Sequence, residues 1–382
     1  MKKYLLTAGP TPVPDRILLA MAREMIHHRH PEFKAIFKEC QDGMRWLYQT
    51  KSTPLFFCCS GSGAMEGAVV NFLSPGDEAI VVVGGKFGER WVELCKAYGI
   101  TAHEIAVEWG HAVDPAAVAR ALEAHPAAKA VYVQASETST GAAHPIQELA
   151  ALTAARPDTL LVVDAITALG VWDVPVDAWG LDVVVCGSQK ALMLPPGLAF
   201  ASVSDKAWRL AERARTARFY FDWRRERKKQ ETADVAFTPA VSLFVGLREA
   251  LAMMKEEGLP GIFARHDLLA RATRAGAQAI GLSLFATAPS VSVTAVNAPA
   301  GVDSQKIVST MRDKYGVAIA GGQDQAKGKI IRLAHLGYFD RFDIVTALSA
   351  LELALGDLGH AVELGASVAA AEKVFAAAGK AK

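Results

Sequence analysis

The sequence predicts an α/β fold: a large domain on a mostly parallel central sheet covered by helices, plus a smaller C-terminal α/β domain. Up to Val203, short continuous apolar runs alternate with helical patterns. Such runs are typical of parallel strands that are buried on both faces. The chain has 382 residues, more than one compact core usually holds. After Ser204 the pattern changes, and a charged segment precedes a second series of strands and helices.

Composition excludes several classes of function. Hydrophobic residues make up 51% and charged residues 21% of the chain, as in globular proteins. The formal net charge of +1 favours neither nucleic acid nor an anionic membrane. Five cysteines, an odd number, indicate reduced thiols and a cytoplasmic setting. The first residues predict neither a signal peptide nor a membrane anchor, and no apolar stretch is long enough to span a bilayer.

The large domain is expected over residues 15–258, after an extended arm at 1–14 that is rich in Gly and Pro. Asp15 can cap a helix through about His28, and Pro31 can start a helix through Trp46. Apolar runs predict seven strands: Leu55–Cys59, Ala79–Val83, Thr101–Ile105, Ala130–Gln134, Thr159–Val163, Val183–Cys186 and Leu198–Val203. Between them the pattern predicts the helices Ala64–Phe72 and Phe87–Tyr98 and helices opened by Pro115 and Pro145.

The remaining chain is expected to form a charged segment, a long helix and a small domain at 259–382. For residues 213–231, a solvated face is favoured over a contact with a polyanion, because the net charge is almost zero. The long helix is Ala240–Glu257. The small domain contains the helices Ile262–Ala279, Ser304–Tyr315 and Phe342–Leu355, the strands Val291–Val296 and Lys329–Leu333, and an Ala-rich tail from Gly365 that is a helix or a frayed end.

Polar residues follow the expected strands where these strands end. In parallel sheets, ligands bind beyond the carboxyl ends of the strands. That rule gathers five segments around one crevice: Ser60–Ser62, Gly84–Phe87, Glu137–Thr140, Asp164 and Lys190. Ser60-Gly61-Ser62-Gly63 stands at a strand-to-helix junction, where backbone N–H groups can face an anion. This segment is either a phosphate cradle or merely a tight turn, since it lacks the spacing of the known phosphate-binding fingerprints.

Lys190 lies between two apolar runs, and burial disfavours a charged lysine there. It either extends its ammonium group to water or serves as a neutral amine. Asp164, at the end of an apolar strand, either caps nearby amides or holds a ligand. An amine, a carboxylate and a phosphate cradle together suit pyridoxal 5'-phosphate: the lysine holds its aldehyde as an imine, and the carboxylate keeps the pyridine nitrogen protonated. Burial near a cationic ring lowers the lysine pKa from its reference value of about 10.4.

Motifs along the whole chain resemble the class V aminotransferases of the fold-type I pyridoxal-phosphate enzymes. The resemblance is strongest to the alanine–glyoxylate, serine–glyoxylate and serine–pyruvate branch. It is carried by these segments in order: GPTPVP (9–14), HRHPEF (28–33), SGSGAME (60–66), GKFGER (85–90), ETSTG (137–141), VDAITALG (163–170), GSQKAL (187–192), PPG (195–197), FTPA (237–240) and IRLAHLG (331–337).

The resemblance implies a role for each matching residue. Lys190 would form the imine and shuttle the proton, and Asp164 would pair with the pyridinium. Arg332 would clamp the substrate α-carboxylate, a bidentate task suited to guanidinium. Gly9 and the arm would line the substrate entrance. The remaining cofactor contacts would be made by Ser60, Gly61, Ser62 and Gln189 at the phosphate, Phe87 on the ring, and Thr138 near the ring hydroxyl.

The same resemblance implies a homodimer with shared active sites. Thr238 would reach the cofactor phosphate of the neighbouring subunit. Val235 stands where some relatives have a phosphate-binding tyrosine, so one donor is missing here. His27, His28 and His30 look like a metal cluster, but their place in an arm motif favours a structural or gating role.

The expected activity is transfer of an amino group between a small α-amino acid, alanine or serine, and a 2-oxo acid, glyoxylate or pyruvate, by a ping-pong mechanism. The alternatives are another class V reaction, namely a lyase, a desulfurase, or a ureidoglycine or aminoethylphosphonate transaminase, or a non-catalytic accessory subunit. A desulfurase needs a nucleophilic cysteine late in the chain, and none follows Cys186. The donor and acceptor are left open by the sequence.

Overall fold

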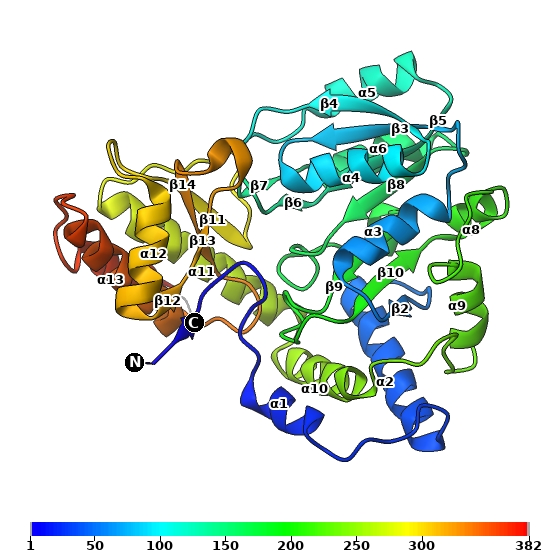
Figure 1. Ribbon diagram of the computed structural model, residues 1–382, viewed down its shortest axis with the longest axis horizontal. Coiled ribbons are helices and arrows are strands. Elements are labelled where there is room, and N and C mark those ends of the chain that lie inside the picture. The colour runs from blue at the N-terminus through cyan, green and yellow to red at the C-terminus, as the bar shows by residue number, and fades with distance from the viewer. Residues whose placement is uncertain (1, 380–382) are drawn as a thin grey trace.

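A seven-stranded sheet dominates the computed structural model, which describes residues 2–379 (Figure 1). Its strand order is β2-β10-β9-β8-β5-β3-β4. The strands are β2 (Leu55–Phe57), β3 (Glu78–Val83), β4 (Thr101–Ala106), β5 (Ala128–Gln134), β8 (Leu160–Asp164), β9 (Val183–Gly187) and β10 (Ala199–Val203). Six of the seven strands run in the same direction, and only β10 is antiparallel to its neighbours β9 and β2. The prediction of a mostly parallel sheet is therefore confirmed.

Helices cover both faces of this sheet, which explains why its strands are continuously apolar. Alternate residues of β3 point into different cores, with Ile80 and Val82 on one face and Ala79 and Val81 on the other. Side chains of α2, α5, α6 and α10 pack on the first face, and those of α3, α4, α8 and α9 on the second. The bounds are α2 (Pro31–Tyr48), α3 (Gly61–Val70), α4 (Lys86–Ala97), α5 (Pro115–Ala124), α6 (Ile146–Ala154), α7 (Val176–Trp179), α8 (Asp205–Ala211), α9 (Trp223–Gln230) and α10 (Val241–Glu257).

The C-terminal part, residues 259–379, has its own sheet and core and gathers at the left of Figure 1. Its sheet is antiparallel, in the order β11-β14-β13. The elements of the C-terminal part are α11 (Leu259–Ala279), β11 (Val293–Asn297), α12 (Ser304–Tyr315), β12 (Val317–Ala318), β13 (Ala320–Gly321), β14 (Ile330–Ala334), α13 (Arg341–Asp357) and α14 (Ala366–Gly379). Only Gly258 separates α10 from α11, so the predicted domain boundary falls on this junction, although the division into domains stays a prediction.

The N-terminal arm is docked on the C-terminal part. Its short strand β1 (Tyr4–Leu5) pairs in parallel with β12. Leu6 and Ala8 belong to the C-terminal core. The arm therefore runs from the C-terminal part across to the large sheet, as the blue segment of Figure 1 shows.

The first helix is shorter than the sequence suggested. α1 (Asp15–Met21) ends well before His28, so the predicted end of this helix was wrong. Only Ile17 and Ala20 of the helix are buried, while Leu19 and Met25 are about 70% exposed. Another turn would therefore find no core to pack against. The His30 imidazole accepts a hydrogen bond from the Glu32 backbone N–H and caps α2, so this histidine has a structural role.

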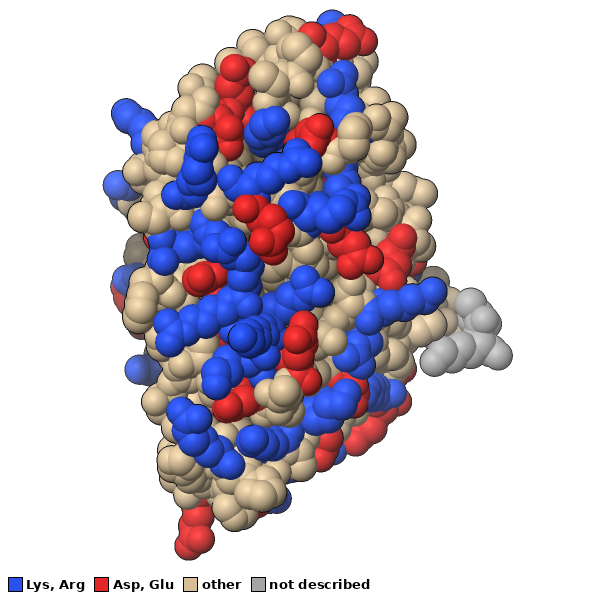
Figure 2. All heavy atoms as spheres, turned by 90° about the vertical axis from the view of Figure 1, so that its right-hand side faces the viewer, with Lys and Arg blue, Asp and Glu red and all other residues tan. Residues whose placement is uncertain are grey.

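The charged segment behaves as a solvated face. On α9, Trp223, Glu226 and Gln230 are buried, whereas Arg225 and residues 227–229 are exposed. Figure 2 shows the side of the molecule at the right of Figure 1, where Lys and Arg side chains are mixed with Asp and Glu. The exposure of these charged side chains agrees with a solvated face, while the absence of a polyanion contact stays a prediction.

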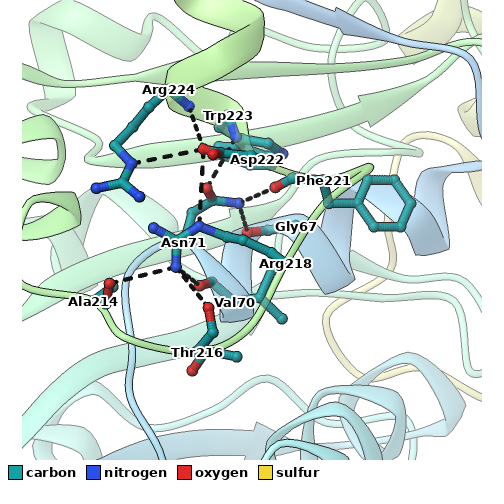
Figure 3. A network of polar contacts seen from close by, with 10 residues as sticks. All are labelled: Gly67, Val70, Asn71, Ala214, Thr216, Arg218, Phe221, Asp222, Trp223 and Arg224. Carbon is teal, nitrogen blue, oxygen red and sulfur yellow. Dashed lines mark hydrogen bonds and ion pairs between the residues drawn. The ribbon is translucent and has the colours of Figure 1, made fainter. Parts of the chain in front are cut away.

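A buried polar network fastens the segment before α9 to the end of α3 (Figure 3). The Asn71 amide donates to the carbonyls of Gly67 (2.8 Å) and Phe221 (2.6 Å) and accepts from the Trp223 backbone N–H (3.0 Å). Arg218 Nη1 donates to the Val70 and Thr216 carbonyls at 3.0 and 2.8 Å. The network fixes the C-terminal end of α3, whose N-terminal end carries Ser60–Ser62.

The cysteines and the helix lengths agree with the sequence. All five cysteines are free thiols, as the odd count predicted. Within residues 2–379, every helix is too short or too polar to cross a membrane.

Candidate active site

The polar segments predicted to share a crevice follow the carboxyl ends of neighbouring strands. Asp164 ends β8, and Gln189 and Lys190 follow β9. Glu137 lies in the two-residue strand β6 (Ser136–Glu137), just after β5, and pairs with β7 (Ala142–Ala143). Phe87 lies in the first turn of α4, the helix after β3. The sheet therefore supplies functional groups from several strands at one edge.

Lys190 carries an amine suited to proton transfer. Burial, together with the nearby Arg332 guanidinium, lowers its pKa to about 8, and Asp164 opposes part of this shift. Nζ donates a hydrogen bond to the Ala8 carbonyl. A side chain on Gly9 would occupy the position of the Lys190 amine, since its Cβ would lie 2.2 Å from Nζ. The N-terminal arm thus covers the Lys190 side chain, and position 9 of the arm has room only for glycine.

Asp164 is a buried carboxylate, 5% exposed. Burial raises its pKa to about 6, although the backbone N–H of Ile166 donates to Oδ1 at 2.8 Å and Arg90 and Lys190 attract the charge. A cationic group placed beside it would favour its ionised form. This is the environment expected for a partner of a protonated pyridine nitrogen.

Ser60, Gly61 and Ser62 form the start of α3. Ser60 is extended, and its side chain makes no hydrogen bond to the helix it precedes. Gly61 has no room for a Cβ, which would lie 2.4 Å from Ile166 Cδ1. A Cβ on Gly187 would lie 3.0 Å from Gln189 Oε1 and 3.7 Å from the Gly61 nitrogen. The side-chain oxygen of Gln189 is buried without a hydrogen-bond partner among the described residues.

Phe87 and Arg90 lie one turn apart on α4. The Arg90 guanidinium carbon is 5.0 Å from the centroid of the Phe87 ring. Arg90 Nη1 donates to Ser62 Oγ at 3.1 Å, which links the ring to the cradle. In the sequence, Arg90 lies within the motif GKFGER without a predicted role, and the signal for its contact was a cation three residues after an aromatic residue on one helix.

Glu137 is a second residue to which the sequence assigned no role. It is completely buried, and burial raises the pKa of its carboxyl to about 7 against several hydrogen bonds that lower it. The backbone N–H groups of Phe87 and Gly88 donate to Oε2 at 3.1 and 3.0 Å, and Ser139 donates to Oε1 through its backbone N–H (3.2 Å) and its hydroxyl. A glutamate directly after a buried strand was the signal in the sequence.

Arg332 lies on β14 of the C-terminal part and is 8% exposed. Burial lowers its pKa to about 10, against the attraction of Glu137. Nε donates to the Gly321 carbonyl at 2.9 Å and Nη1 to the Thr138 carbonyl at 2.8 Å. Thr138 in turn shares a hydrogen bond with the Thr167 hydroxyl at 2.7 Å. The guanidinium is thereby fixed beside the turn that carries Thr138.

Thr238 is placed apart from this group. It is exposed and lines an open hollow of about 590 Å³ together with residues 25–28 and 239–243. Within one chain it therefore does not join Lys190. Val235 is buried in the core of the large sheet, 7% exposed, so this side chain serves packing and offers no donor to a ligand.

The residues present fit pyridoxal 5'-phosphate. The N-terminus of α3, with no Cβ at Gly61 or Gly187, leaves a small polar cradle suited to a phosphate group, and the Gln189 side chain, whose amide nitrogen can donate, lies beside it. Asp164 suits the ring nitrogen and Lys190 the aldehyde. Phe87 offers an aromatic ring next to Arg90, which contacts Ser62 of the cradle.

Comparisons with known proteins agree with this geometry. Residues 3–345 match the family model "Aminotransferase class-V". A soluble hydrogenase small subunit of Synechococcus is 45% identical over 99% of both chains. Serine–glyoxylate aminotransferase of Methylorubrum extorquens is 36% identical over 97% of this chain and 95% of that protein. The crystal structure of ureidoglycine–glyoxylate aminotransferase from Bacillus subtilis superposes with a TM-score of 0.92 over 98% of both chains, at 28% identity.

Proposed function

This chain belongs to the class V aminotransferases, which depend on pyridoxal 5'-phosphate, and we propose that it moves the amino group of alanine or serine to glyoxylate or pyruvate. Transamination itself follows from the family. The choice of a small donor is supported by the similarity to a serine–glyoxylate aminotransferase. The observation that carries the proposal is the buried Arg332 guanidinium, held by the Gly321 and Thr138 carbonyls and near enough to Lys190 to lower its pKa, because it provides a site for an α-carboxylate in the region of the reacting amine.

Arg332 would bind and orient the substrate. Two of its nitrogens already hold backbone carbonyls, and Nη2 donates to none of the described residues. A carboxylate that reaches this guanidinium would gain a charge-assisted hydrogen bond in a site largely closed to water. Substrate Cα would then lie on the side of the site that Lys190 faces.

Lys190 would move the proton. The bound cofactor supplies an aldehyde that captures the amino group and a ring that withdraws electrons from Cα. A pKa of about 8 leaves a substantial neutral fraction of the Nζ amine near neutral pH, so it can take the proton from Cα and return it elsewhere. Asp164 would hold the ring-nitrogen proton. The cycle ends when a 2-oxo acid takes the amino group away.

A homodimer with shared sites is the second part of the proposal. Thr238 is exposed at the open hollow described above, where a second subunit could bring it to a neighbouring cradle. That arrangement would add a hydroxyl donor for the phosphate, whereas Val235 offers none.

The alternative reactions are less well supported. The similarity to ureidoglycine–glyoxylate aminotransferase keeps ureidoglycine as a candidate donor. A phosphonate donor lacks the α-carboxylate that Arg332 would bind. A desulfurase would need a cysteine that the sequence lacks after Cys186. A non-catalytic role would leave the lowered pKa of Lys190 without a purpose.

A half-reaction panel tests the proposal. Purified protein loaded with pyridoxal 5'-phosphate is mixed with alanine, serine, aspartate, ureidoglycine or aminoethylphosphonate, and loss of the absorbance of the lysine-bound cofactor is followed. Alanine or serine should react fastest, and Arg332→Gln should raise the KM for the donor at least tenfold. Conversion by a simple amine but by no α-amino acid would show that the role given to Arg332 is wrong.

A further inference from the structure

The turn Ser136–Ser139 touches three parts of the site. Its Glu137 and Ser139 side chains contact the first turn of α4, its Thr138 hydroxyl meets Thr167 after β8, and its Thr138 carbonyl holds Arg332 of the C-terminal part. One short segment therefore lies between the cofactor stacking residue and the substrate clamp. The contacts of Glu137 show how the segment is held.

Glu137 satisfies the free N–H groups at the start of α4. A helix leaves its first backbone N–H groups without partners inside the helix, and its N-terminus favours negative charge. Glu137 Oε2 accepts from Phe87 and Gly88, while Ser139 Oγ accepts from the Lys86 backbone N–H at 3.1 Å. Three of these groups are thus paired with one turn, and the position of the Phe87 backbone is set by the Glu137 carboxylate.

The backbone around Glu137 is shaped for this contact. A Cβ on Gly85 would lie 2.4 Å from Ser139 Oγ and 2.6 Å from Glu137 Cδ, and a Cβ on Gly88 would lie 2.6 Å from the Val82 carbonyl oxygen. Glycine at position 85 therefore leaves room for the carboxylate, and glycine at position 88 lets α4 lie close against the backbone of β3. Burying a carboxylate completely costs free energy unless the carboxylate is fully hydrogen-bonded. A solvent-exposed residue could cap the start of α4 without this cost, so a buried glutamate is an unusual cap.

The same carboxylate is linked to Arg332. The two side chains attract each other electrostatically, and Arg332 Nη1 donates to the carbonyl of Thr138, the residue next to Glu137. Two connections of different kinds therefore run from Glu137 to the guanidinium. A shift of the turn would move Phe87 and Arg332 together.

We propose that Glu137 is a positioning residue that fixes the Phe87 ring and the Arg332 guanidinium relative to each other. This inference rests on the proposed function, which gives the substrate carboxylate to Arg332, and on the place on the cofactor ring that the family resemblance predicts for Phe87. Glu137 touches neither ligand in this scheme. It acts through the first turn of α4 and through the Thr138 backbone, so cofactor affinity and substrate affinity both depend on it.

Glu137→Gln tests the proposal, with Glu352→Gln as the matched control. Glu352 is also buried, and it accepts from the Gly365 and Ser367 backbone N–H groups at 2.6 and 2.7 Å and from the Ser367 hydroxyl. It caps the start of α14 in the same way, within the C-terminal part. Both variants place an amide NH₂ group where a carboxylate oxygen accepted hydrogen bonds.

For Glu137→Gln we expect the Kd for pyridoxal 5'-phosphate, titrated into the apo-protein, and the KM for the amino donor each to rise roughly tenfold. The kcat at saturation should fall less. For Glu352→Gln we expect lower thermal stability with unchanged Kd and KM. Unchanged Kd and KM in Glu137→Gln, or an equal rise in both variants, would overturn the positioning role.

A second measurement does not depend on the proposed function. Amide hydrogen exchange of the apo-protein should speed up at Phe87 and Gly88 and around Thr138 in Glu137→Gln, but not in Glu352→Gln. If the wild-type protein bound no pyridoxal 5'-phosphate, the proposed function would fail while this readout would still decide the role of Glu137. Exchange unchanged at these positions in Glu137→Gln would contradict the proposal.

Discussion

At the scale of single residues, burial shifts the pKa values of ionisable side chains in the site away from their ordinary values. Burial lowers the pKa of Lys190 to about 8 and raises the pKa of Glu137 to about 7. Both shifts cost folding free energy near neutral pH, because a charged group has left water. The site therefore reduces the stability of the protein without its cofactor.

Replacing Lys190 by Met should stabilise the apo-protein at pH 7. Below its folded pKa of about 8 the buried lysine is charged in both states, so its burial penalty is fully present, and this penalty is relieved only as the pH rises from 8 towards 10.5. Allowing for the lost hydrogen bond to Ala8, we expect a gain of about 1–3 kcal/mol in the free energy of unfolding. Urea unfolding measures it.

The control for this substitution is Lys206→Met. Lys206 Nζ lies 3.0 Å from Asp182 Oδ2, and the Asp182 side chain is 5% exposed. Removing the lysine strands a buried carboxylate and should destabilise the protein. Borohydride should fix the cofactor to the wild-type protein and to Lys206→Met, but not to Lys190→Met. A Lys190→Met apo-protein less stable than wild type at pH 7 would disprove the burial argument.

The raised pKa of Glu137 predicts how stability depends on pH. Its folded pKa of about 7 lies above its reference value of 4.5, so the native state holds a proton that the unfolded state releases. Stability from this group is complete below pH 4.5 and is lost as the pH rises through 7, a change of up to about 3 kcal/mol. Asp164, raised to about 6, adds a change of the same sign, and Arg332 opposes the shift of Glu137.

Glu137→Gln should remove this part of the pH dependence. Unfolding free energies of the apo-protein measured in urea between pH 4.5 and 8 should fall less steeply for the variant than for wild type. Asp164 also raises the pKa of Glu137 by charge repulsion, so only the part of the Asp164 contribution that is independent of Glu137 cancels in the comparison. Parallel pH profiles for the two proteins would show that Glu137 is ionised in both the folded and the unfolded state.

The sequence could identify candidate functional residues at the ends of strands, but it could not predict which groups these residues contact. Asp164 and Lys190 stood at strand ends, and the structure places them at one sheet edge. Glu137 stood in the same position without a role, because its partners are backbone N–H groups of a helix about 50 residues away. Backbone donors carry no sequence signal, so such a contact appears only in three dimensions.

At the scale of elements, the two ends of α3 have different roles: the N-terminal end belongs to the candidate site, and the C-terminal end is anchored by hydrogen bonds. Its first residues form the cradle, and Asn71 ties its last turn to the segment before α9. Asn71 is completely buried and makes three hydrogen bonds. Its amide is therefore what joins two segments separated by some 150 residues of chain.

Asn71→Ala should destabilise the protein by about 2–4 kcal/mol, because it leaves the Phe221 carbonyl and the Trp223 N–H without partners in the interior. Thermal and urea unfolding measure the loss. The control is Arg213→Ala: Arg213 pairs with Asp158 at the surface, where the two side chains are 72% and 57% exposed. That change should stay within about 0.5 kcal/mol. Equal effects of the two substitutions would contradict the structural role of Asn71.

Element positions were predicted well where apolar periodicity determined them. The seven strands of the large sheet appear at the expected places with shifts at their ends. The error at α1 has a physical cause: the run Asp15–His28 has good helix formers, but tertiary packing supports only its first two turns. The two-residue strands β1 and β12 had no signal, because pairing over such a short length depends on where the arm lies.

At the scale of the whole molecule, the site is assembled from segments spread over almost the entire chain. Gly9 and Lys190 are in contact, and Arg332 acts on Lys190 from the C-terminal part. Only Thr238 among the predicted residues lies apart, exposed at the surface. A second subunit would complete the set.

Mixed dimers test this arrangement. Lys190→Met and Thr238→Ala should each have little activity alone, the second through weak cofactor binding. When the two variants are unfolded together and refolded, a dimer that contains one of each has one site with both Lys190 and Thr238. Activity should return to at most about a quarter of wild type. No gain over the separate variants would exclude a contribution of Thr238 across subunits.

The pairing of β1 with β12 has a consequence for synthesis. Tyr4 finds its partner at Val317, so about 310 residues must be translated before the arm can dock, roughly 15–60 s at usual elongation rates. Through that interval the large sheet can already form, while Lys190 has no Ala8 carbonyl beside it. The nascent chain therefore exposes the Lys190 loop before the arm covers it, and a cofactor would have its widest access to Lys190 during that time.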